Sequence, residues 1–394
     1  MDKNIDKNCY IVIEMINQTK NLNFFFKSLK TLKKFGLKKP LTLSSPHLII
    51  WETTSQCNLK CKHCYAKAGK KSEDELNTSD ALKTIDILHN FGVNMIAFSG
   101  GEPLLRKDIF ELTKYASKKG IYVSIDTNGT LINKEKAKEM KNSGISYIRV
   151  SLDSHDKNIH DSFRGVQGAF DKTIEGIKNV VGDFKVSTST TITKNNYNEF
   201  EKIIELGKSL GVNQILFDEF IPAGRGAELL NYDLEPEERE NFLKSIYKKM
   251  RTSNVDIVVA FCEITRIAYQ IDGCRKIAPT YNANYRGFLK NIKANFFGGC
   301  PVGNLSINIK PNGDIIPCSF FDLKIGNVLK TDLNDLWENN KILKELRNRD
   351  SLKPNCGECK YKYICGGCRA RAYAYFGDYL AEDPGCIYNK KILQ

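Results

Sequence analysis

The stretch that decides both fold and chemistry is Cys57-Asn-Leu-Lys-Cys61-Lys-His-Cys64, which places three cysteines within eight positions. It follows a β-branched, apolar run at 47–53 that predicts a buried strand. Three thiolates are one fewer than a structural zinc or a fully ligated iron–sulfur cluster requires. The neighbouring His63 is poorly placed to share one tetrahedral metal with Cys64. A [4Fe–4S] cluster with three cysteine ligands and one iron open to a small molecule explains the count best.

Downstream of this stretch, strand patterns alternate with helical patterns as far as about residue 220. Strands are expected at 47–53, 94–99, 122–127, 147–152, 186–193 and 214–220, and helices near 79–91, 107–119, 134–143, 168–181 and 197–210. This order predicts an α/β fold with a parallel (β/α)6 sheet, either open and doubly wound or a partial barrel. Ligands are then expected at the carboxyl ends of the strands. After Gly226 a helix near 236–251 and a strand near 256–261 are expected, followed by an irregular stretch to Gly299, and the βα alternation is expected to end.

Composition and charge argue against a membrane-spanning protein and against a nucleic-acid-binding protein. The chain has 394 residues, 41% of them hydrophobic, and no apolar run approaches the ~18 residues of a membrane span. Its net charge of +13 comes mostly from dispersed lysines, which argues against a nucleic-acid partner. The N-terminus lacks the pattern of a secretion signal, so a cytoplasmic location is expected. In a reducing compartment, thirteen cysteines indicate metal ligands rather than disulfides.

Seven of these cysteines lie between residue 300 and the end of the chain. They are Cys300, Cys318, Cys356, Cys359, Cys365, Cys368 and Cys386. A hairpin is predicted between them at 305–310 and 314–319, followed by a helix near 333–349. Two Cys-x2-Cys pairs could form a zinc ribbon, although the loop between them is unusually tight.

The expected domain order has four parts. Residues 1–46 form a helical extension whose amphipathic stretch, 22–35, packs on the body of the protein. Residues 47–235 form the βα domain, 236–299 a bridging region, and 300–394 the cysteine-rich domain.

The spacing Cys-x3-Cys-x2-Cys, with an aromatic residue before the last cysteine, resembles that of the radical S-adenosylmethionine (SAM) enzymes. The segment Ser99-Gly-Gly-Glu-Pro103 resembles their element that holds the amino group of SAM, with Glu102 facing the ammonium. The resemblance implies a partial TIM-like barrel in which an external electron cleaves SAM to methionine and a 5′-deoxyadenosyl radical, which abstracts hydrogen from the substrate. The implied SAM contacts are Gly100, Gly101, Glu102, Asn128, Ser151 and Arg164.

The seven C-terminal cysteines resemble the SPASM extension of these enzymes, which carries one or two auxiliary [4Fe–4S] clusters. The resemblance implies one cluster on Cys356, Cys359, Cys365 and Cys386, and another on Cys300, Cys318 and Cys368. The usual three-residue gap before the sixth cysteine is two residues here, Gly366 and Gly367. The second cluster also lacks a fourth ligand, which Cys262 or Cys274 could supply, unless the site is open to substrate.

The segments 365–373, 377–384 and 222–226 resemble the alternative haem biosynthesis branch, whose enzymes act on carboxylate side chains of iron tetrapyrroles. Arg225, Arg369 and Arg371 would then lie near the site and suit a polycarboxylate. Peptide-modifying maturases and maturases of tungsten or molybdenum enzymes share the architecture. A non-catalytic electron carrier is the alternative from another class, disfavoured by the open-iron motif and Glu102. The expected partners are a reductant such as ferredoxin or flavodoxin and a tetrapyrrole or peptide substrate. No residue is singled out as catalytic.

Overall fold

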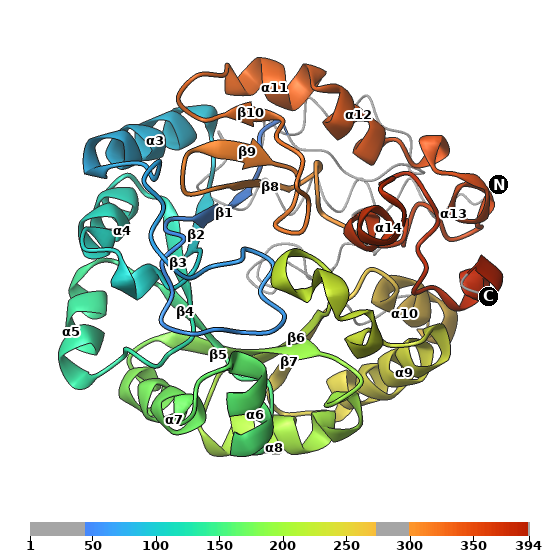
Figure 1. The fold of residues 1–394 in the computed structure, drawn as a ribbon, viewed down its shortest axis with the longest axis horizontal. Helices are drawn as coiled ribbons and strands as arrows, with labels where there is room; N and C mark the ends of the chain where they lie inside the picture. The colour runs from blue at the N-terminus through green and yellow to red at the C-terminus, as the bar shows by residue number, and fades with distance from the viewer. Residues whose placement is uncertain (1–43, 273–298, 393–394) are drawn as a thin grey trace, which may run out of the picture.

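One curved sheet organises residues 44–272 and 299–392, the parts of the chain that this computed structural model describes (Figure 1). Its strand order is β10-β9-β8-β1-β2-β3-β4-β5-β6-β7. The parallel strands before residue 272 are β1 (Leu48–Glu52), β2 (Met95–Ser99), β3 (Tyr122–Thr127), β4 (Tyr147–Ser151), β5 (Lys185–Ile192), β6 (Gln214–Glu219) and β7 (Asp256–Ala260).

Helices form a ring outside this sheet (Figure 1). They are α3 (Thr78–Phe91), α4 (Ile109–Lys118), α5 (Lys134–Asn142), α6 (Lys157–Arg164), α7 (Ala169–Val180), α8 (Phe200–Ser209), α9 (Pro236–Thr252) and α10 (Ile264–Asp272). Alternation along β1 divides its side chains between two environments. Ile49 and Trp51 are buried in the main hydrophobic core, whereas Ile50 lines the central cavity. The core therefore lies between strands and helices, and polar side chains can point inward.

The α/β class and the parallel sheet are confirmed, but the alternation does not end after Gly226. The helix and the strand predicted near 236–251 and 256–261 are present as α9 and β7, and they add another unit because β7 pairs in parallel with β6 from Gln214↔Asp256 onward. The helix α6 was not predicted. Asp156 caps its first turn and Gly165, with φ of 72°, ends it.

The cysteine-rich segment joins the same sheet. Its elements are β8 (Ser306–Ile309), β9 (Asp314–Ile316), β10 (Gly326–Asn327), α11 (Leu333–Asn339), α12 (Lys341–Arg347), α13 (Pro354–Glu358) and α14 (Arg369–Phe376). The predicted hairpin is β8–β9, and β8 also pairs in parallel with β1. The single helix expected at 333–349 is wrong, because Asn340 separates α11 from α12 and caps the latter. Residues 300–318 are thereby brought beside the strand that precedes Cys57.

The predicted amphipathic helix at 22–35, Cys9 and Cys274 lie outside the described residues. The four domain boundaries stay a prediction. Among the helices of the described ranges, none is long and apolar enough to cross a membrane.

Candidate functional site

One cavity opens where the parallel strands end, and both cysteine regions line it. From the first region it is lined by Cys57, Cys61 and Cys64, and from the second by Cys262, Cys300, Cys318 and Cys368. Gly100, Gly101, Asn128, Ser151 and Arg164, five of the six predicted SAM contacts, line the same cavity. The fold therefore brings residues separated by up to about three hundred positions to one space.

The loop of residues 57–64 is held from several sides. The amide of Cys57 donates to the carbonyl of Gly69 at 2.9 Å, and the amide of Lys60 donates to the carbonyl of Arg164 at 3.1 Å. Arg225 donates from Nε to the Cys61 carbonyl at 2.9 Å and from Nη1 to the Ala68 carbonyl at 2.6 Å. The three thiols pack in one small cluster with apolar neighbours. Burial raises the pKa of the Cys57 thiol to about 11, so a bound metal is needed to favour its thiolate.

Gly100 and Gly101 have a packing role, and their predicted contact with SAM stays a prediction. A Cβ on Gly100 would lie 2.4 Å from the Thr54 carbonyl oxygen, and a Cβ on Gly101 would lie 2.2 Å from that of Gln56. Gly100 also has a φ of 129°. The glycines therefore admit the chain that leads into Cys57, whatever they also do for SAM.

Glu102 is fully buried at the end of β2. Its carboxylate accepts hydrogen bonds from the Thr127 hydroxyl at 2.7 Å, the Asn128 amide at 2.8 Å and the Leu104 amide at 3.1 Å. Burial raises the pKa of Glu102 despite these donors. The carboxylate thus ties β2 to β3, and its pairing with the SAM ammonium stays a prediction.

Asn128, Ser151 and Arg164 are the remaining predicted SAM contacts. The Asn128 side chain donates to Asn58 Oδ1 at 2.8 Å, next to the cysteine loop. Arg164 is buried, pairs through Nε with Asp153 at 2.5 Å, and places Nη1 3.8 Å from the Cys61 sulfur. Ser151, at the end of β4, lines the cavity.

The second sulfur site includes Cys262, which lies two residues after the end of β7 and is buried. Hydrogen bonds connect its thiol with the sulfurs of Cys300 and Cys368, and a Glu219 carboxylate oxygen lies within 4.8 Å of the Cys262 and Cys368 sulfurs. The hydrogen bond from Cys262 and the nearby Arg349 lower the pKa of Cys300 to about 6. The hydrogen bond from Cys262 lowers the pKa of Cys368 as well, whereas the pKa of Cys262 itself and of buried Cys318 is raised. Thiolates at Cys300 and Cys368 are the kind of ligand that iron requires.

The two-residue gap at Gly366 and Gly367 has a conformational explanation. Both glycines have positive φ, 73° and 63°, which reverses the chain between Cys365 and Cys368. A Cβ on Gly366 would also lie 2.4 Å from the Arg349 guanidinium. Cys368 thereby reaches the cavity, whereas Cys365 does not line it.

The other cysteines lie behind this turn and away from the cavity lining. Cys356 Sγ accepts hydrogen bonds from the Asp383 amide at 3.5 Å and from Asn389 Nδ2 at 3.6 Å. Burial raises the pKa of Cys386 to about 12, and Cys365 and Cys386 interact electrostatically. Cys359 is partly exposed.

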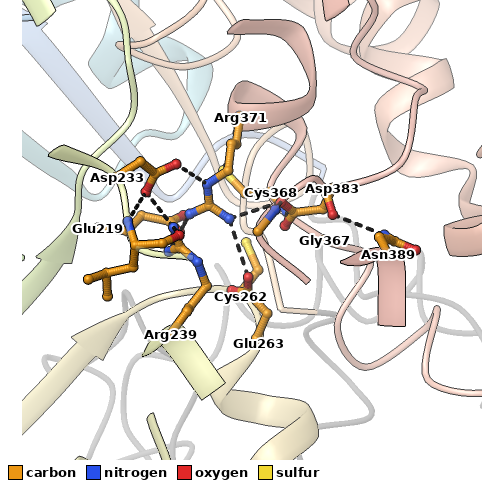
Figure 2. A network of polar contacts seen from close by, with 12 residues as sticks. Glu219, Asp233, Arg239, Cys262, Glu263, Gly367, Cys368, Arg371, Asp383 and Asn389 are labelled. Atoms are coloured by element: carbon orange, nitrogen blue, oxygen red, sulfur yellow. Dashed lines mark hydrogen bonds and ion pairs between the residues drawn. The ribbon is translucent and has the colours of Figure 1, made fainter. Parts of the chain in front are cut away.

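A buried network of charged groups lies beside Cys262 and Cys368 of the second sulfur site (Figure 2). Arg371 is fully buried and pairs with Glu219, with Asp383 at 2.9 Å, with Glu263 at 3.3 Å and with Asp233 at 3.5 Å. Burial raises the pKa of Glu219 well above its usual value, although Arg371 opposes this. The network positions Cys368 through Asp383 and leaves Arg371 no access to a ligand.

The expectation that Arg225, Arg369 and Arg371 all meet a polycarboxylate is therefore wrong for Arg371. Arg369 is also buried, and its guanidinium donates to the carbonyls of Gly367, Tyr379 and Ala381. Arg225 and Arg369 both line the cavity, but only Arg225 is exposed.

Comparison with known proteins agrees with this geometry. The chain matches the Radical SAM superfamily over residues 51–207 and the SPASM iron–sulfur cluster-binding domain over residues 300–360. The AdoMet-dependent heme synthase of Methanosarcina barkeri is 35% identical over 347 residues, which are 88% of this chain and 97% of that protein. The Fe-coproporphyrin III synthase of the same organism is 34% identical over 359 residues, 87% of this chain and 88% of that one.

The fold of this chain is similar to that of solved structures. SuiB of Streptococcus suis has been solved with its precursor peptide SuiA and with S-adenosylmethionine. Both structures have a TM-score of 0.68 and 19% identity, and they cover 91% and 92% of this chain and 77% and 80% of SuiB.

Proposed function

We propose that this chain, which belongs to the radical SAM superfamily and carries a SPASM domain, acts on the carboxylate side chains of an iron tetrapyrrole in haem biosynthesis. It is an enzyme, and its two domains imply [4Fe–4S] clusters, with SAM as the second cofactor. The relationship to heme synthases supports the substrate class. The observation that carries the proposal is one cavity whose lining includes cysteines of both sulfur sites. A substrate in this cavity would lie next to both sites.

The walls of this cavity suit a flat, apolar macrocycle. The rings of Tyr65 and Phe320 meet edge to face with centroids 5.2 Å apart, and Phe220 and Ile221 line the same space. Arg225 lines the cavity and donates to backbone carbonyls through Nε and Nη1, so its remaining N–H groups can meet a propionate or acetate group. Aromatic side chains and one exposed cation in the cavity lining are the pattern that an amphipathic polycarboxylate requires.

A cluster bound by Cys57, Cys61 and Cys64 would supply the electron that cleaves SAM, whose 5′-deoxyadenosyl radical takes hydrogen from the substrate. Gly100, Gly101, Glu102, Asn128, Ser151 and Arg164 form the proposed SAM contacts. Arg225 and Arg164 hold the cysteine loop in place, the first through backbone carbonyls and the second through the Cys61 sulfur. Apolar walls exclude water from the reacting centre.

Two auxiliary sites are proposed. Cys356, Cys359, Cys365 and Cys386 would hold one cluster. Cys300, Cys318 and Cys368 would hold the other, with Cys262 as its fourth ligand, because Cys262 contacts Cys300 and Cys368. Cys274 is then left outside the ligand set.

The electron is proposed to come from a ferredoxin or flavodoxin. A cytoplasmic compartment is proposed as well, since every described cysteine is a free thiol and a reducing environment preserves such thiols.

The proposal is tested with the full chain reconstituted anaerobically with iron and sulfide. Iron coproporphyrin III, SAM and dithionite are added, and 5′-deoxyadenosine and porphyrin mass are followed. We expect 5′-deoxyadenosine together with a porphyrin that has lost carboxylate groups, and neither product from a Cys57/Cys61/Cys64→Ala variant. SAM cleavage that leaves the porphyrin unchanged, but modifies a peptide, would contradict the substrate class.

A further inference from the structure

Two buried arginines pack on the turn at 365–368, which joins the second sulfur site to the remaining cysteines. The third sulfur site comprises the other four C-terminal cysteines, Cys356, Cys359, Cys365 and Cys386. The turn begins at Cys365 of the third site and ends at Cys368 of the second. Arg349 is 2% exposed and Arg369 is 1% exposed. A guanidinium keeps its charge inside a protein, and its burial is costly unless an anion lies nearby.

Arg349 contacts the turn and the second site together. A Cβ on Gly366, inside the turn, would collide with its guanidinium. Its Nη2 donates to the Cys300 carbonyl at 3.4 Å. Burial lowers the pKa of Arg349. Three sulfur groups oppose this effect, those of Cys300, Cys262 and Cys365. Arg349 therefore interacts with cysteines of both sites.

Arg369 packs on the next residue of the same turn. Its Nε donates to the Gly367 carbonyl at 3.3 Å, and its Nη2 lies 3.7 Å from Cys356 Sγ of the third site. Burial raises the pKa of Cys356, and the charge of Arg369 opposes that rise. Arg349 and Arg369 also repel each other. The turn thus has two like charges beside it in a buried setting.

Asp383 does not by itself balance these two charges. Its carboxylate interacts with Arg369, but it also pairs with Arg371 at 2.9 Å and accepts the Cys368 amide at 2.6 Å (Figure 2). The groups that attract Arg349 most strongly are the cysteines named above. Iron binds cysteine as thiolate, so loading both sites places negative charge on each side of Arg349.

Access to the cavity does not explain the charge of Arg349. Within the described ranges, Arg349 does not line the cavity, whereas Arg369 does. A carboxylate of a substrate in the cavity is therefore not its counter-ion. The anions that its position does suit are the thiolates of the two sulfur sites.

We propose that Arg349 is a shared counter-ion of the two auxiliary clusters, an inference that rests on the proposed function because it requires both clusters. A cluster held by four thiolates is anionic, and its reduction adds one further negative charge. A cation in the low-dielectric interior stabilises the reduced state more than the oxidised state. Arg349 therefore raises the reduction potentials of both clusters.

The test measures the midpoint potentials of the auxiliary clusters by redox titration followed by electron paramagnetic resonance. The full chain carries the Cys57/Cys61/Cys64→Ala substitutions, so only the auxiliary clusters contribute. Arg349→Met, which removes the charge, should lower both midpoints by about a factor of ten or more in the one-electron reduction constant, or about 59 mV. Arg349→Lys keeps the charge and should retain most of both potentials.

Arg347→Met is the matched control. Arg347 lies two residues before Arg349, and its guanidinium donates to the carbonyls of Gly303 and Trp337 at 2.5 Å each. Burial lowers the pKa of Arg347 to about 10, and Glu338 rather than a cysteine opposes this effect. The control removes the same charge from the same segment and should change both midpoints much less.

A fall of one midpoint only, no fall, or an equal fall in Arg347→Met overturns the shared counter-ion. If Arg349→Met binds no auxiliary iron, Arg349→Lys decides. Full iron and retained midpoints in the lysine variant support the proposal, whereas the same loss of iron in it overturns the role of charge. Fewer than about eight irons in the parent chain would instead refute the two proposed auxiliary sites, so the two failures are distinguishable.

Discussion

The carboxylate of Asp383 accepts a 2.6 Å hydrogen bond from the backbone amide of Cys368, while the amide of Asp383 donates to the sulfur of Cys356. One residue thus contacts both proposed auxiliary sites. Burial disfavours its charge, but Arg371 and the Cys368 amide hold the pKa of Asp383 below its usual range. Asp383, held by its buried ion pair with Arg371, therefore links the geometry of the two sites.

Replacing Asp383 by Asn should destabilise the protein because Arg371 would keep its charge but lose one of its partners. Breaking a buried pair costs about 3 kcal/mol of unfolding free energy, whereas a surface pair is worth less than about 1 kcal/mol. Asp378→Asn, which breaks the more exposed pair with Lys353, is the control. Thermal unfolding of the two variants is compared with the wild type. Equal, small shifts in Tm would show that the network is not a strong stabiliser.

Cys262→Ser should alter the cluster proposed at Cys300, Cys318 and Cys368, because the variant removes a thiol that contacts two of its ligands. We expect a changed electron paramagnetic resonance spectrum of that cluster and a loss of up to about four irons per chain. Cys274→Ser is the matched control and should retain about twelve irons. The opposite pattern, with iron lost only in Cys274→Ser, would assign the fourth ligand to Cys274.

Gly101→Ala should weaken iron binding at the first site. The added Cβ would meet the Gln56 backbone oxygen at 2.2 Å, so the chain entering Cys57 would have to shift. Overpacking of this kind costs about 1–3 kcal/mol. A Cβ on Gly69, at the other end of the loop, would meet nothing within 4 Å, so Gly69→Ala should be neutral. Iron content and Tm are measured for both, and similar behaviour of the two variants would refute the packing argument.

Glu52 predicts a pH dependence of stability. It is buried at the end of β1, and burial raises its pKa to about 7, with Lys310 opposing. The folded state therefore binds a proton more tightly than the unfolded chain, whose carboxyl has a pKa of about 4.5. This contribution, about 3 kcal/mol in full, is present below pH ~4.5 and is lost as the pH rises through about 7.

The Glu52→Gln variant stays neutral at all pH values and should avoid that loss. We expect the Tm of the wild type to fall relative to Glu52→Gln between pH 5 and pH 8. Parallel Tm curves for the two proteins would show that Glu52 is not protonated in the folded state.

Local patterns were sufficient to predict the parallel strands, since β2 is buried along its whole length and reads as an apolar run. Local patterns were not sufficient to predict α6. Asp156 caps this helix, but its eight residues are mostly polar and show no clear apolar periodicity. That helix presents Arg164 to Cys61. Segments this short depend on tertiary packing.

Long-range pairing explains the other differences. Cys262 could be named only as an alternative, because its approach to Cys300 and Cys368 follows from the position of β7 in the sheet. The burial of Arg371 likewise depends on Glu219 and Asp383, which are 152 and 12 residues away. Spacing along the chain predicts which residues would bind metal, but it does not predict which charged side chains pair with one another.

The most direct test of the account follows hydrogen from substrate to cofactor. Iron coproporphyrin III deuterated on its propionate side chains is incubated with the reconstituted enzyme, SAM and dithionite, and the 5′-deoxyadenosine is analysed by mass spectrometry. The account predicts deuterium in 5′-deoxyadenosine and a porphyrin product that has lost carboxylate groups. Unlabelled 5′-deoxyadenosine with an intact porphyrin would contradict it.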